Sequence, residues 1–367
     1  MFQFGPSTRI RQTPFHDATV ADGLSAVTSY NHMILPTGYG DPAAEYDRLL
    51  NGVAMWDVAA ERQIELRGPD AARLAQVLSP RDLSKCKVGQ GKYVALCNHA
   101  GTLLNDPILL KLAEDRFWIS IADSNILFWA NAIAAERGMD VQVFEADAAP
   151  LAVQGPKAED VIADMFGEDI RSMRYFWFAE KSVDGIPVML ARSGWSKQGG
   201  FEIYLMDGSR GTDLWNHVKA AGAPYGIGPG NPNATERIES GLLSWGGDTD
   251  AATNPFEVRM GNYVDLDVPD DVVGIQALRQ IAAEGPKRHQ LGAIFDGDTP
   301  RTPVTRWAPV TRDGTKIGDI TCSTYSPRLQ ANIGFALVAR DAQAGDTVSI
   351  TLPDTEVTAR LTELPFI

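Results

Sequence analysis

Two segments of this 367-residue chain place polar side chains where packing alone does not require them. The first is Gly101–Pro107, in which Asn105 and Asp106 stand between a glycine turn and an apolar strand. An acid at the beginning of a strand can be presented to a ligand. The same pattern is also typical of a turn closed by hydrogen bonds from side chains to the backbone.

The second segment runs from Ala191 to Tyr204, where one strand ends, a glycine-bounded loop carries Trp195, and a new strand begins. Side chains alternate along a strand, so Glu202 and Tyr204 share the face opposite Phe201 and Ile203. An acid and a phenol on one face can line a pocket. The alternative is a solvent-exposed face beside a hairpin.

The sequence lacks the motifs of several other chemistries. No GxGxxG follows a strand, no GxxxxGK[ST] loop occurs, and Gly194–Gln198 lacks the last glycine of a GxSxG nucleophile elbow. The five histidines are scattered, without a pair at metal-ligand spacing, so we expect no metal site. Three cysteines without CxxC spacing indicate free thiols in a reducing compartment: Cys86, Cys97 and Cys322.

Composition bounds the class of protein. The chain is 44% hydrophobic and 22% charged, which excludes wholesale disorder. Its net charge of −14 argues against binding to nucleic acid or to anionic membranes. No run reaches the roughly 18 apolar residues of a membrane span, and the start has no apolar stretch typical of a secretory signal. We therefore expect a cytoplasmic protein.

Local patterns predict an α+β fold, because helical and strand-like runs alternate without a regular βαβ order. Asp41 and Pro42 are expected to begin one helix, and Gly52 to end it. After Gly285 the helix signals nearly vanish, which predicts a C-terminal β domain, either a barrel or a jelly-roll. The polar segment Thr249–Asn254 is expected to be a surface loop. Further helices are predicted over 124–137, 156–166, 212–221, 233–244 and 275–283, and strands over 63–66, 93–97, 107–112, 117–121, 141–144, 188–192 and 201–205.

Several of these segments together resemble the glycine-cleavage T-protein (aminomethyltransferase) family. The resemblance rests on motifs in the same order over almost the whole chain: Tyr93 with Asn105-Asp106, Gln154-Gly155-Pro156, Gly200-Phe201-Glu202-Ile203, and Glu236–Leu242. Further segments resemble the branch of this family that moves a methyl group from the sulfonium dimethylsulfoniopropionate to tetrahydrofolate: 30–33, 56–63, 81–84, 193–200 and 364–367.

The resemblance implies a three-domain, cloverleaf-like fold with tetrahydrofolate in a central channel. Its first domain would comprise residues 1–55 and 147–240, its second 56–146 and 241–284, and its third 285–367. A homodimer is compatible with it, and the partners expected are a small-molecule methyl donor and the folate, with neither nucleic acid nor membrane.

The same resemblance assigns roles to individual residues. Glu202 would hold the pterin ring, since a carboxylate accepts two hydrogen bonds from its amino group and ring N–H. Tyr93, Tyr204 and Arg237 match other cofactor-binding positions. Asp106 matches the acid near the transferred group, and Trp195 could hold a cationic donor by cation–π attraction. Asp106 and Trp195 are therefore the candidate catalytic residues, acting mainly through alignment.

The loop Ser193–Gly200 departs from the aminomethyltransferase pattern, which has threonine and tyrosine around the glycines and then an acidic residue, because Trp195, Lys197 and Gln198 stand there instead. This weakens the case for a lipoyl-protein partner, and Lys197 is either a partner for a substrate carboxylate or a solvated lysine. Two alternatives stay open. One is the same fold with an aminomethyl or O-methyl donor; the other is a folate-binding, non-enzymatic iron–sulfur assembly factor.

Overall fold

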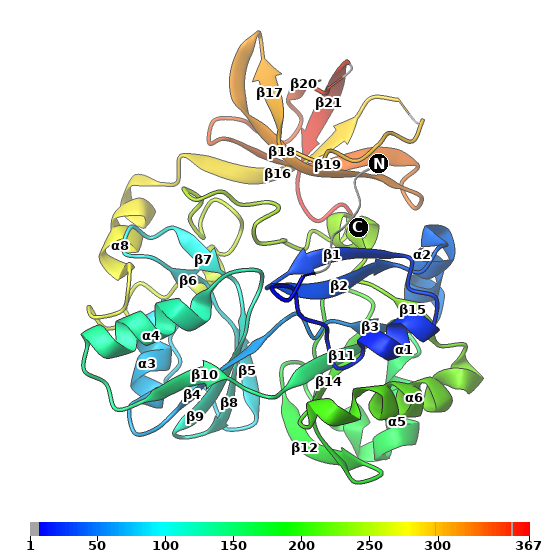
Figure 1. Cartoon of the computed structure of the whole chain (residues 1–367). Helices are drawn as coiled ribbons and strands as arrows, with labels where there is room; N and C mark the ends of the chain where they lie inside the picture. Colours follow the sequence, from blue (N-terminus) through cyan, green and yellow to red (C-terminus); the bar gives the residue numbers. More distant parts are fainter. Residues whose placement is uncertain (1–6, 298, 354) are drawn as a thin grey trace. The chain divides into compact units, whose positions relative to one another are not determined.

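The computed structural model of the chain describes residues 7–297, 299–353 and 355–367. Helices and mostly antiparallel strands alternate irregularly, which confirms the α+β class (Figure 1). The chain forms two compact units from separated segments. Unit 1 extends to Leu74 and includes Lys85–Lys92 and Pro107–Asn233; unit 2 holds Ala75–Ser84, Tyr93–Asp106 and Ala234–Ile367. The three-domain boundaries inferred from the resemblance stay a prediction.

A six-stranded sheet organises one half of unit 1. Its strand order is β12-β13-β14-β11-β3-β15, antiparallel except where β15 runs parallel to β3. Its strands are β3 (Ala54–Asp57), β11 (Ala149–Gln154), β12 (Phe178–Val183), β13 (Ile186–Ala191), β14 (Gly200–Leu205) and β15 (Gly228–Gly230).

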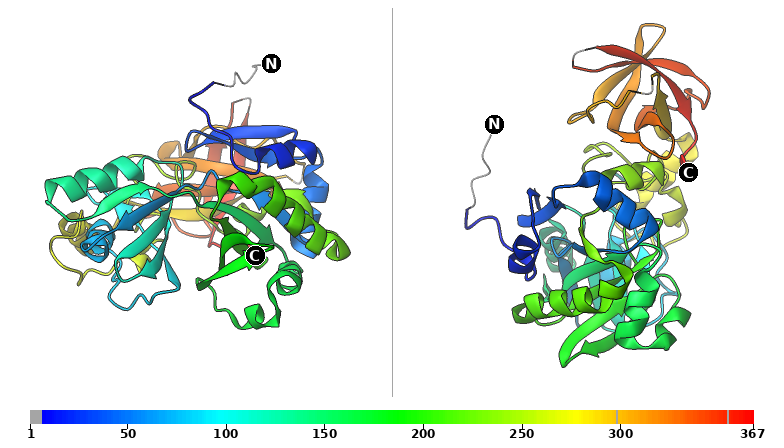
Figure 2. Two further views of the ribbon diagram at one scale, coloured as in Figure 1. Left: turned by 60° about the horizontal axis from the view of Figure 1, so that its bottom comes forward. Right: turned by 90° about the vertical axis from the view of Figure 1, so that its right-hand side faces the viewer.

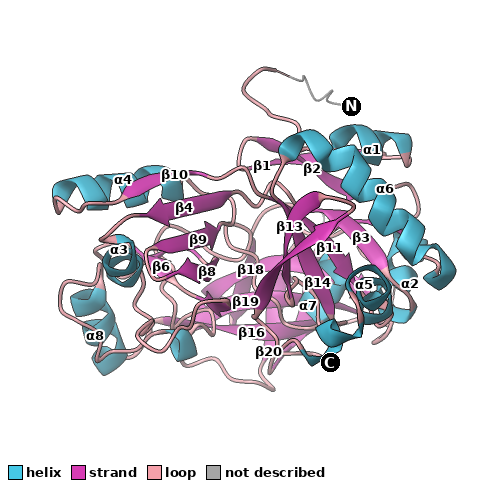
Figure 3. Cartoon of the chain, turned by 90° about the horizontal axis from the view of Figure 1, so that it is seen from below, coloured by secondary structure: helices cyan, strands magenta, loops and turns pink. Residues whose placement is uncertain are grey.

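Helices cover one face of this sheet, as Figure 3 shows for α5 and α6. The apolar side chains that alternate along β14 enter this core, where they join residues of α1 (His16–Ala21), α5 (Ala158–Phe166) and α6 (Gly211–Gly222). Burying such side chains contributes about 1.5–3 kcal/mol each, so the face of β14 that carries Phe201 and Ile203 is fixed inward. The register of the strand then fixes the direction of the intervening residues.

A five-stranded sheet, in the order β10-β4-β9-β8-β5, also belongs to unit 1. A hairpin of β1 and β2 precedes it. The helix α2 begins as predicted, because the Asp41 carboxylate accepts from the backbone N–H groups of Ala43 (3.1 Å) and Ala44 (3.0 Å). The remaining bounds are β1 (Ala26–Tyr30), β2 (Met33–Gly38), α2 (Pro42–Asn51), β4 (Gln63–Arg67), α3 (Ala71–Leu78), β5 (Gln90–Tyr93), β8 (Ile108–Ala113), β9 (Arg116–Ser120), α4 (Ile126–Glu136) and β10 (Gln142–Glu145).

The C-terminal part of unit 2 is a closed antiparallel barrel, in the order β16-β19-β18-β17-β20-β21 (Figure 2). This confirms the β domain and selects the barrel over the jelly-roll. Alternation is clearest on the last strand, where Val357, Ala359 and Leu361 point into the core. The strands are β16 (Arg288–Phe295), β17 (Ala308–Arg312), β18 (Thr315–Ser326), β19 (Ala331–Ala339), β20 (Thr347–Thr351) and β21 (Glu356–Thr362).

The rest of unit 2 contains β6 (Leu96–Cys97), β7 (Leu103–Asn105), α7 (Ala234–Glu239) and α8 (Ile275–Glu284). The prediction of a helix over 233–244 was wrong at its end. Gly241 takes a left-handed conformation (φ 71°), and the N–H of Leu242 donates to the carbonyl of Arg237, so the helix stops early. Over the described residues, no helix is long and apolar enough to cross a membrane.

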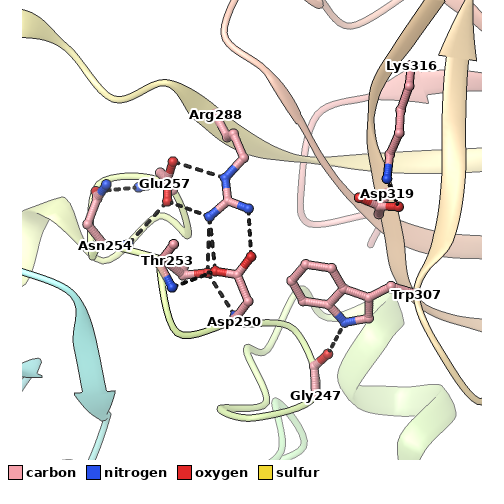
Figure 4. Close-up of polar contacts among 10 residues, drawn as sticks. Gly247, Asp250, Thr253, Asn254, Glu257, Arg288, Trp307, Lys316 and Asp319 are labelled. Atoms are coloured by element: carbon pink, nitrogen blue, oxygen red, sulfur yellow. Dashed lines mark hydrogen bonds and ion pairs between the residues drawn. The ribbon is translucent and has the colours of Figure 1, made fainter.

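The prediction of a surface loop over Thr249–Asn254 was correct only in part: the segment is a loop that exposes Ala251 and Ala252, but Thr249, Thr253 and Asn254 are buried. Their polar groups find partners within unit 2 (Figure 4). Arg288 donates to Asp250 Oδ2 (2.9 Å) and to Glu257 (3.0 Å), and Thr253 Oγ1 donates to Asp250 Oδ1 (2.7 Å). A polar segment can be buried when it satisfies its own hydrogen bonds.

Candidate functional site

Glu202 lies in the middle of β14, on the face that turns away from the helices. Tyr204 lies on the same face, whereas Phe201, Ile203 and Leu205 enter the helix-covered core, as the strand period predicts. The alternative of a solvent-exposed face is wrong, because Glu202 is 7% and Tyr204 only 1% exposed. The structure therefore encloses a carboxyl group inside unit 1.

Over the described residues, the side-chain groups that hydrogen-bond to Glu202 are hydroxyls, and none is a cation. The hydroxyls of Ser193 and Tyr204 both donate to Oε2, the second over 3.1 Å. Ala152 on β11 and Ala191 on β13 stand beside Glu202 in the register. Burial raises the pKa of Glu202, although the two hydrogen bonds oppose this. Within the described chain Oε1 accepts no hydrogen bond, so it is available to donors on a ligand.

The Ser193–Gly200 loop positions the Ser193 donor, and Gln154 of β11 holds this loop. The buried amide of Gln154 donates to the carbonyls of Ser193 (3.2 Å) and Phe201 (3.4 Å) and accepts from the hydroxyl of Ser196 (2.8 Å). Sequence reasoning missed the roles of Gln154 and Ser193. Two features of the sequence could have indicated these roles: the glycines at the two ends of the loop, and the motif Gln154-Gly155-Pro156, which contains the glutamine.

Trp195 and Lys197 lie in the same loop with different environments. Trp195 is half-buried, and Lys197 is exposed. The indole therefore presents part of its surface to solvent or ligand, as a cation–π role requires.

In unit 2, Tyr93 and Asp106, which the resemblance assigns to the site, form a hydrogen bond with each other. The Tyr93 hydroxyl donates to Asp106 Oδ2 over 2.7 Å, and the Tyr93 ring meets the Tyr263 ring edge-on at 4.9 Å. Desolvation raises the pKa of Asp106 to about 7, although the bond from Tyr93 opposes this. Burial, then the Asp106 charge, raises the pKa of Tyr93. Asp106 is therefore a poorly hydrated acid, and the hydrogen bond from the Tyr93 phenol fixes its orientation.

Arg237 is built into the interior of unit 2. It is 8% exposed, and its Nη1 donates to Asp248 (2.6 Å) and to the Leu242 carbonyl (3.2 Å). Burial lowers the pKa of Arg237, but the charge of Asp248, the neighbouring Cys322 and the hydrogen bond to Asp248 together outweigh burial, so the pKa is raised. Asp248 also accepts from the Thr321 hydroxyl (3.0 Å). This ion pair supports a structural role for Arg237, beside the cofactor-binding role implied by the resemblance.

Other polar groups of unit 2 also have structural partners. Glu239 is fully buried and bound by Arg328 and Ser326, so it is a structural acid.

All three cysteines are free and buried, and burial raises the pKa of the Cys322 thiol to about 12, which disfavours a nucleophilic thiolate. In the part of the chain that is described, no three His, Cys, Asp or Glu side chains gather as a metal site would require.

Comparisons with known proteins show which family the chain belongs to. The GCVT N-terminal domain profile matches residues 15–268, and the glycine cleavage T-protein C-terminal barrel domain profile matches residues 288–367. Dimethylsulfoniopropionate demethylase of Ruegeria pomeroyi is 41% identical, over 95% of both chains. Aminomethyltransferase of Saccharopolyspora erythraea is 30% identical, over 97% of this chain and 98% of that one.

A solved structure supports the fold independently of close sequence similarity. The glycine cleavage system aminomethyltransferase T of Bartonella henselae superposes with a TM-score of 0.85 at 23% identity, over 98% of both chains. Both parts of the family architecture are thus present in one chain, in the family's order. The chain belongs to the glycine-cleavage T-protein family.

Proposed function

We propose that this protein is a tetrahydrofolate-dependent methyltransferase that demethylates dimethylsulfoniopropionate. The products are 5-methyltetrahydrofolate and methylthiopropionate. The similarity of 41% over 95% of both chains to a demethylase of that substrate supports the choice of donor. The geometric observation that carries the cofactor part is the enclosed Glu202 carboxyl, with hydroxyl donors on Oε2 and an available Oε1.

Glu202 is proposed to bind the pterin of the folate. A pterin offers an amino group and an adjacent ring N–H, which match the two oxygens of one carboxylate. Ser193 and Tyr204 orient the carboxyl group, and Tyr204 adds an aromatic surface beside it. Such hydrogen bonds to a charged group contribute about 1.5–3 kcal/mol each, which suffices to orient the ring.

Trp195 is proposed to hold the sulfonium donor. A half-buried indole attracts a cation with about 0.5–2 kcal/mol. In the reaction the bond from sulfur to the methyl carbon breaks, and its electron pair stays on sulfur as a neutral thioether. Nitrogen N5 of the folate forms the new bond to carbon and gives up its proton to solvent. No electron acceptor is needed, so the protein contributes mainly alignment.

Asp106 and Tyr93 are proposed to contact the folate or the methyl group in transfer. Their hydrogen bond holds the acid in one orientation. Because the thioether leaves without protonation, this chemistry requires no proton transfer to Asp106. Arg237, bound to Asp248, is proposed as a cofactor-binding residue that acts from a fixed position.

Incubation with tetrahydrofolate and candidate donors under anaerobic conditions, with mass analysis of the folate, tests this function. We expect dimethylsulfoniopropionate to yield 5-methyltetrahydrofolate and methylthiopropionate in equal amounts. A methylene product from aminomethyl-lipoyl protein, with no methylated folate from the sulfonium, would instead assign an aminomethyltransferase. Folate binding without turnover of any donor would favour the assembly-factor alternative.

We further propose that the protein works in the cytoplasm, without nucleic acid or membrane partners, and that a homodimer is its assembly. The net charge of −14 supports the first part, because it opposes contact with phosphate-rich surfaces. Light scattering coupled to size-exclusion chromatography measures the assembly. A mass of one chain would remove the dimer from the proposal.

A further inference from the structure

Gln154 ends β11 on the same face of the sheet as Glu202. In the register with β14, Gln154 stands opposite Gly200, and Ala152 stands opposite Glu202. Its side chain is 1% exposed, so its amide groups must find partners within the protein. All of these partners lie in the loop from Ser193 to Phe201. The amide nitrogen donates to the carbonyls of Ser193 and Phe201, and the amide oxygen accepts from the hydroxyl of Ser196.

The loop has the shape that this amide requires. Gly194 has φ 152° and Gly200 has φ 156°, and a Cβ atom at either position would overlap the Gln154 amide. Both glycines therefore allow the loop backbone to approach the glutamine side chain. The two ends of the loop close on a single side chain, which limits the positions available to the residues between them.

Ser193 connects this anchor to the candidate cofactor acid. Its carbonyl accepts from Gln154, and its hydroxyl donates to Glu202 Oε2. Displacing the Ser193 backbone would therefore remove one of the two hydrogen bonds that Glu202 receives. The contacts run from Gln154 through Ser193 to Glu202 without a gap, and all three residues belong to unit 1.

We propose that Gln154 is a positioning residue for the cofactor acid: its amide fixes the Ser193–Gly200 loop, so that the Ser193 hydroxyl stays on Oε2 and Oε1 stays available to the ligand. The identity of that ligand as a pterin rests on the proposed function. The positioning itself rests only on the contacts within this chain.

The groups around Glu202 make its ionisation a sensitive measure of this positioning. Tyr204 faces Glu202 from the same strand, and the charge of the Glu61 carboxyl helps to raise the pKa of Tyr204. The flanking strands place two uncharged residues, Ala152 and Ala191, beside Glu202. The guanidinium of Arg192 lies over the ring of Phe201, whose side chain is on the opposite face of the sheet from Glu202. Losing the Ser193 bond would remove support for the charged form and raise the pKa of Glu202 further.

The test follows the protonated carboxyl band of Glu202 by infrared spectroscopy against pH, in the full chain without ligand. Loss of the band in Glu202→Gln assigns it, and Ser193→Ala gives the full effect of losing the donor. We expect Gln154→Met, which preserves volume and removes the amide, to raise the midpoint by at least half of the Ser193→Ala shift. Ser196→Ala, which removes only one contact, should give a smaller rise.

Gln290→Met is the matched control, because Gln290 is likewise buried (3% exposed) but belongs to the barrel strand β16. It should lower the melting temperature without moving the Glu202 midpoint. A midpoint unchanged in Gln154→Met despite a lower melting temperature would overturn the proposal. If Gln154→Met does not fold, an unchanged midpoint in Ser196→Ala overturns it, and the expected rise supports it.

Binding of tetrahydrofolate supplies the link to function. Gln154→Met should weaken it at least about fivefold at neutral pH, because Glu202 is less ionised and less well oriented. Failure of the parent protein to bind tetrahydrofolate would contradict the proposed function. The infrared midpoints would still decide whether Gln154 positions Ser193.

Discussion

Two buried acids of this protein have opposite environments. In unit 2, Asp248 is completely buried and meets the guanidinium of Arg237 at 2.6 Å, with a further hydrogen bond from Thr321. In unit 1, Glu202 is nearly as buried, yet it accepts its hydrogen bonds from the hydroxyls of Ser193 and Tyr204. Only the first acid has its charge compensated by the fold.

The difference separates a structural acid from a binding acid. Breaking a buried ion pair leaves an uncompensated charge, so the Arg237–Asp248 pair is integral to the folded state of unit 2. A buried carboxyl without a cation has a raised pKa and an unfilled capacity to accept hydrogen bonds. A ligand with two N–H donors would supply what the fold leaves out. The comparison therefore predicts that mutations at Asp248 change stability and that mutations at Glu202 change binding.

The largest effect is expected from Asp248→Ala. It leaves the Arg237 guanidinium buried without its partner and removes the acceptor of Thr321, so the free energy of unfolding should fall by about 3–5 kcal/mol. Urea denaturation followed by circular dichroism measures this. A loss below about 1 kcal/mol would show that Asp248 is not a structural acid and would remove the contrast with Glu202.

Glu202→Gln should have the reverse profile. The amide preserves shape but cannot accept two hydrogen bonds from a pterin, so we expect tetrahydrofolate affinity to fall at least about tenfold. Stability should change by about 1 kcal/mol or less, because no cation loses its partner. Calorimetric titration and urea denaturation of the same preparation give both numbers. Unchanged affinity would exclude Glu202 from the folate site.

The sequence predicted the parts of this contrast that depend on periodicity. The alternation of Phe201, Glu202, Ile203 and Tyr204 set the two faces of β14, and the capping pattern at Asp41 set the start of α2. Periodicity could not predict that Glu202 is enclosed. That depends on Ala152 and Ala191 in strands that are neighbours only after folding.

Contacts between distant segments account for the remaining misses. The pairing of Asp248 with Arg237 was not predicted, because the helix that carries Arg237 was expected to extend to Ser244. The helix actually ends at Glu239. Gly228–Gly230 was missed as a strand because glycine and proline disfavour strands. It pairs with β3, where a Cβ on Gly230 would lie 3.0 Å from the Trp56 indole nitrogen, so a larger residue would require the indole to shift.

Trp195→Ala sharpens the comparison within unit 1, because it separates the donor from the cofactor. We expect kcat/KM for dimethylsulfoniopropionate to fall about 2- to 30-fold, which corresponds to the loss of a cation–π contact. Tetrahydrofolate affinity should change less than about twofold, since the Glu202 contacts remain. Steady-state kinetics and calorimetric titration check the two halves. A larger loss in folate affinity than in donor use would assign Trp195 to the folate instead.

The smallest effect is expected at Asp250, a paired acid that, unlike Asp248, remains 38% exposed. Hydrogen bonds from Arg288 lower its pKa from 3.8 to about 2. A carboxyl with a lowered folded-state pKa stabilises the protein above pH 4, and this contribution is lost as the pH falls toward 2. Asp250→Asn should therefore cost about 1 kcal/mol or less near neutral pH, because solvent screens a partly exposed pair.

The pH dependence of that cost distinguishes Asp250 from its surroundings. The difference between parent and Asp250→Asn in urea denaturation should shrink between pH 4 and pH 2, because the parent carboxyl is then protonated as well. Asp319→Asn is the matched control, since its partner Lys316 is exposed and the pair, also drawn in Figure 4, should contribute close to nothing. A cost at Asp250 that stays constant down to pH 2 would mean that Asn disrupts the packing of the Thr249–Asn254 segment, and that the charge of Asp250 contributes little. In that case burial alone, without charge pairing, would hold this segment in unit 2.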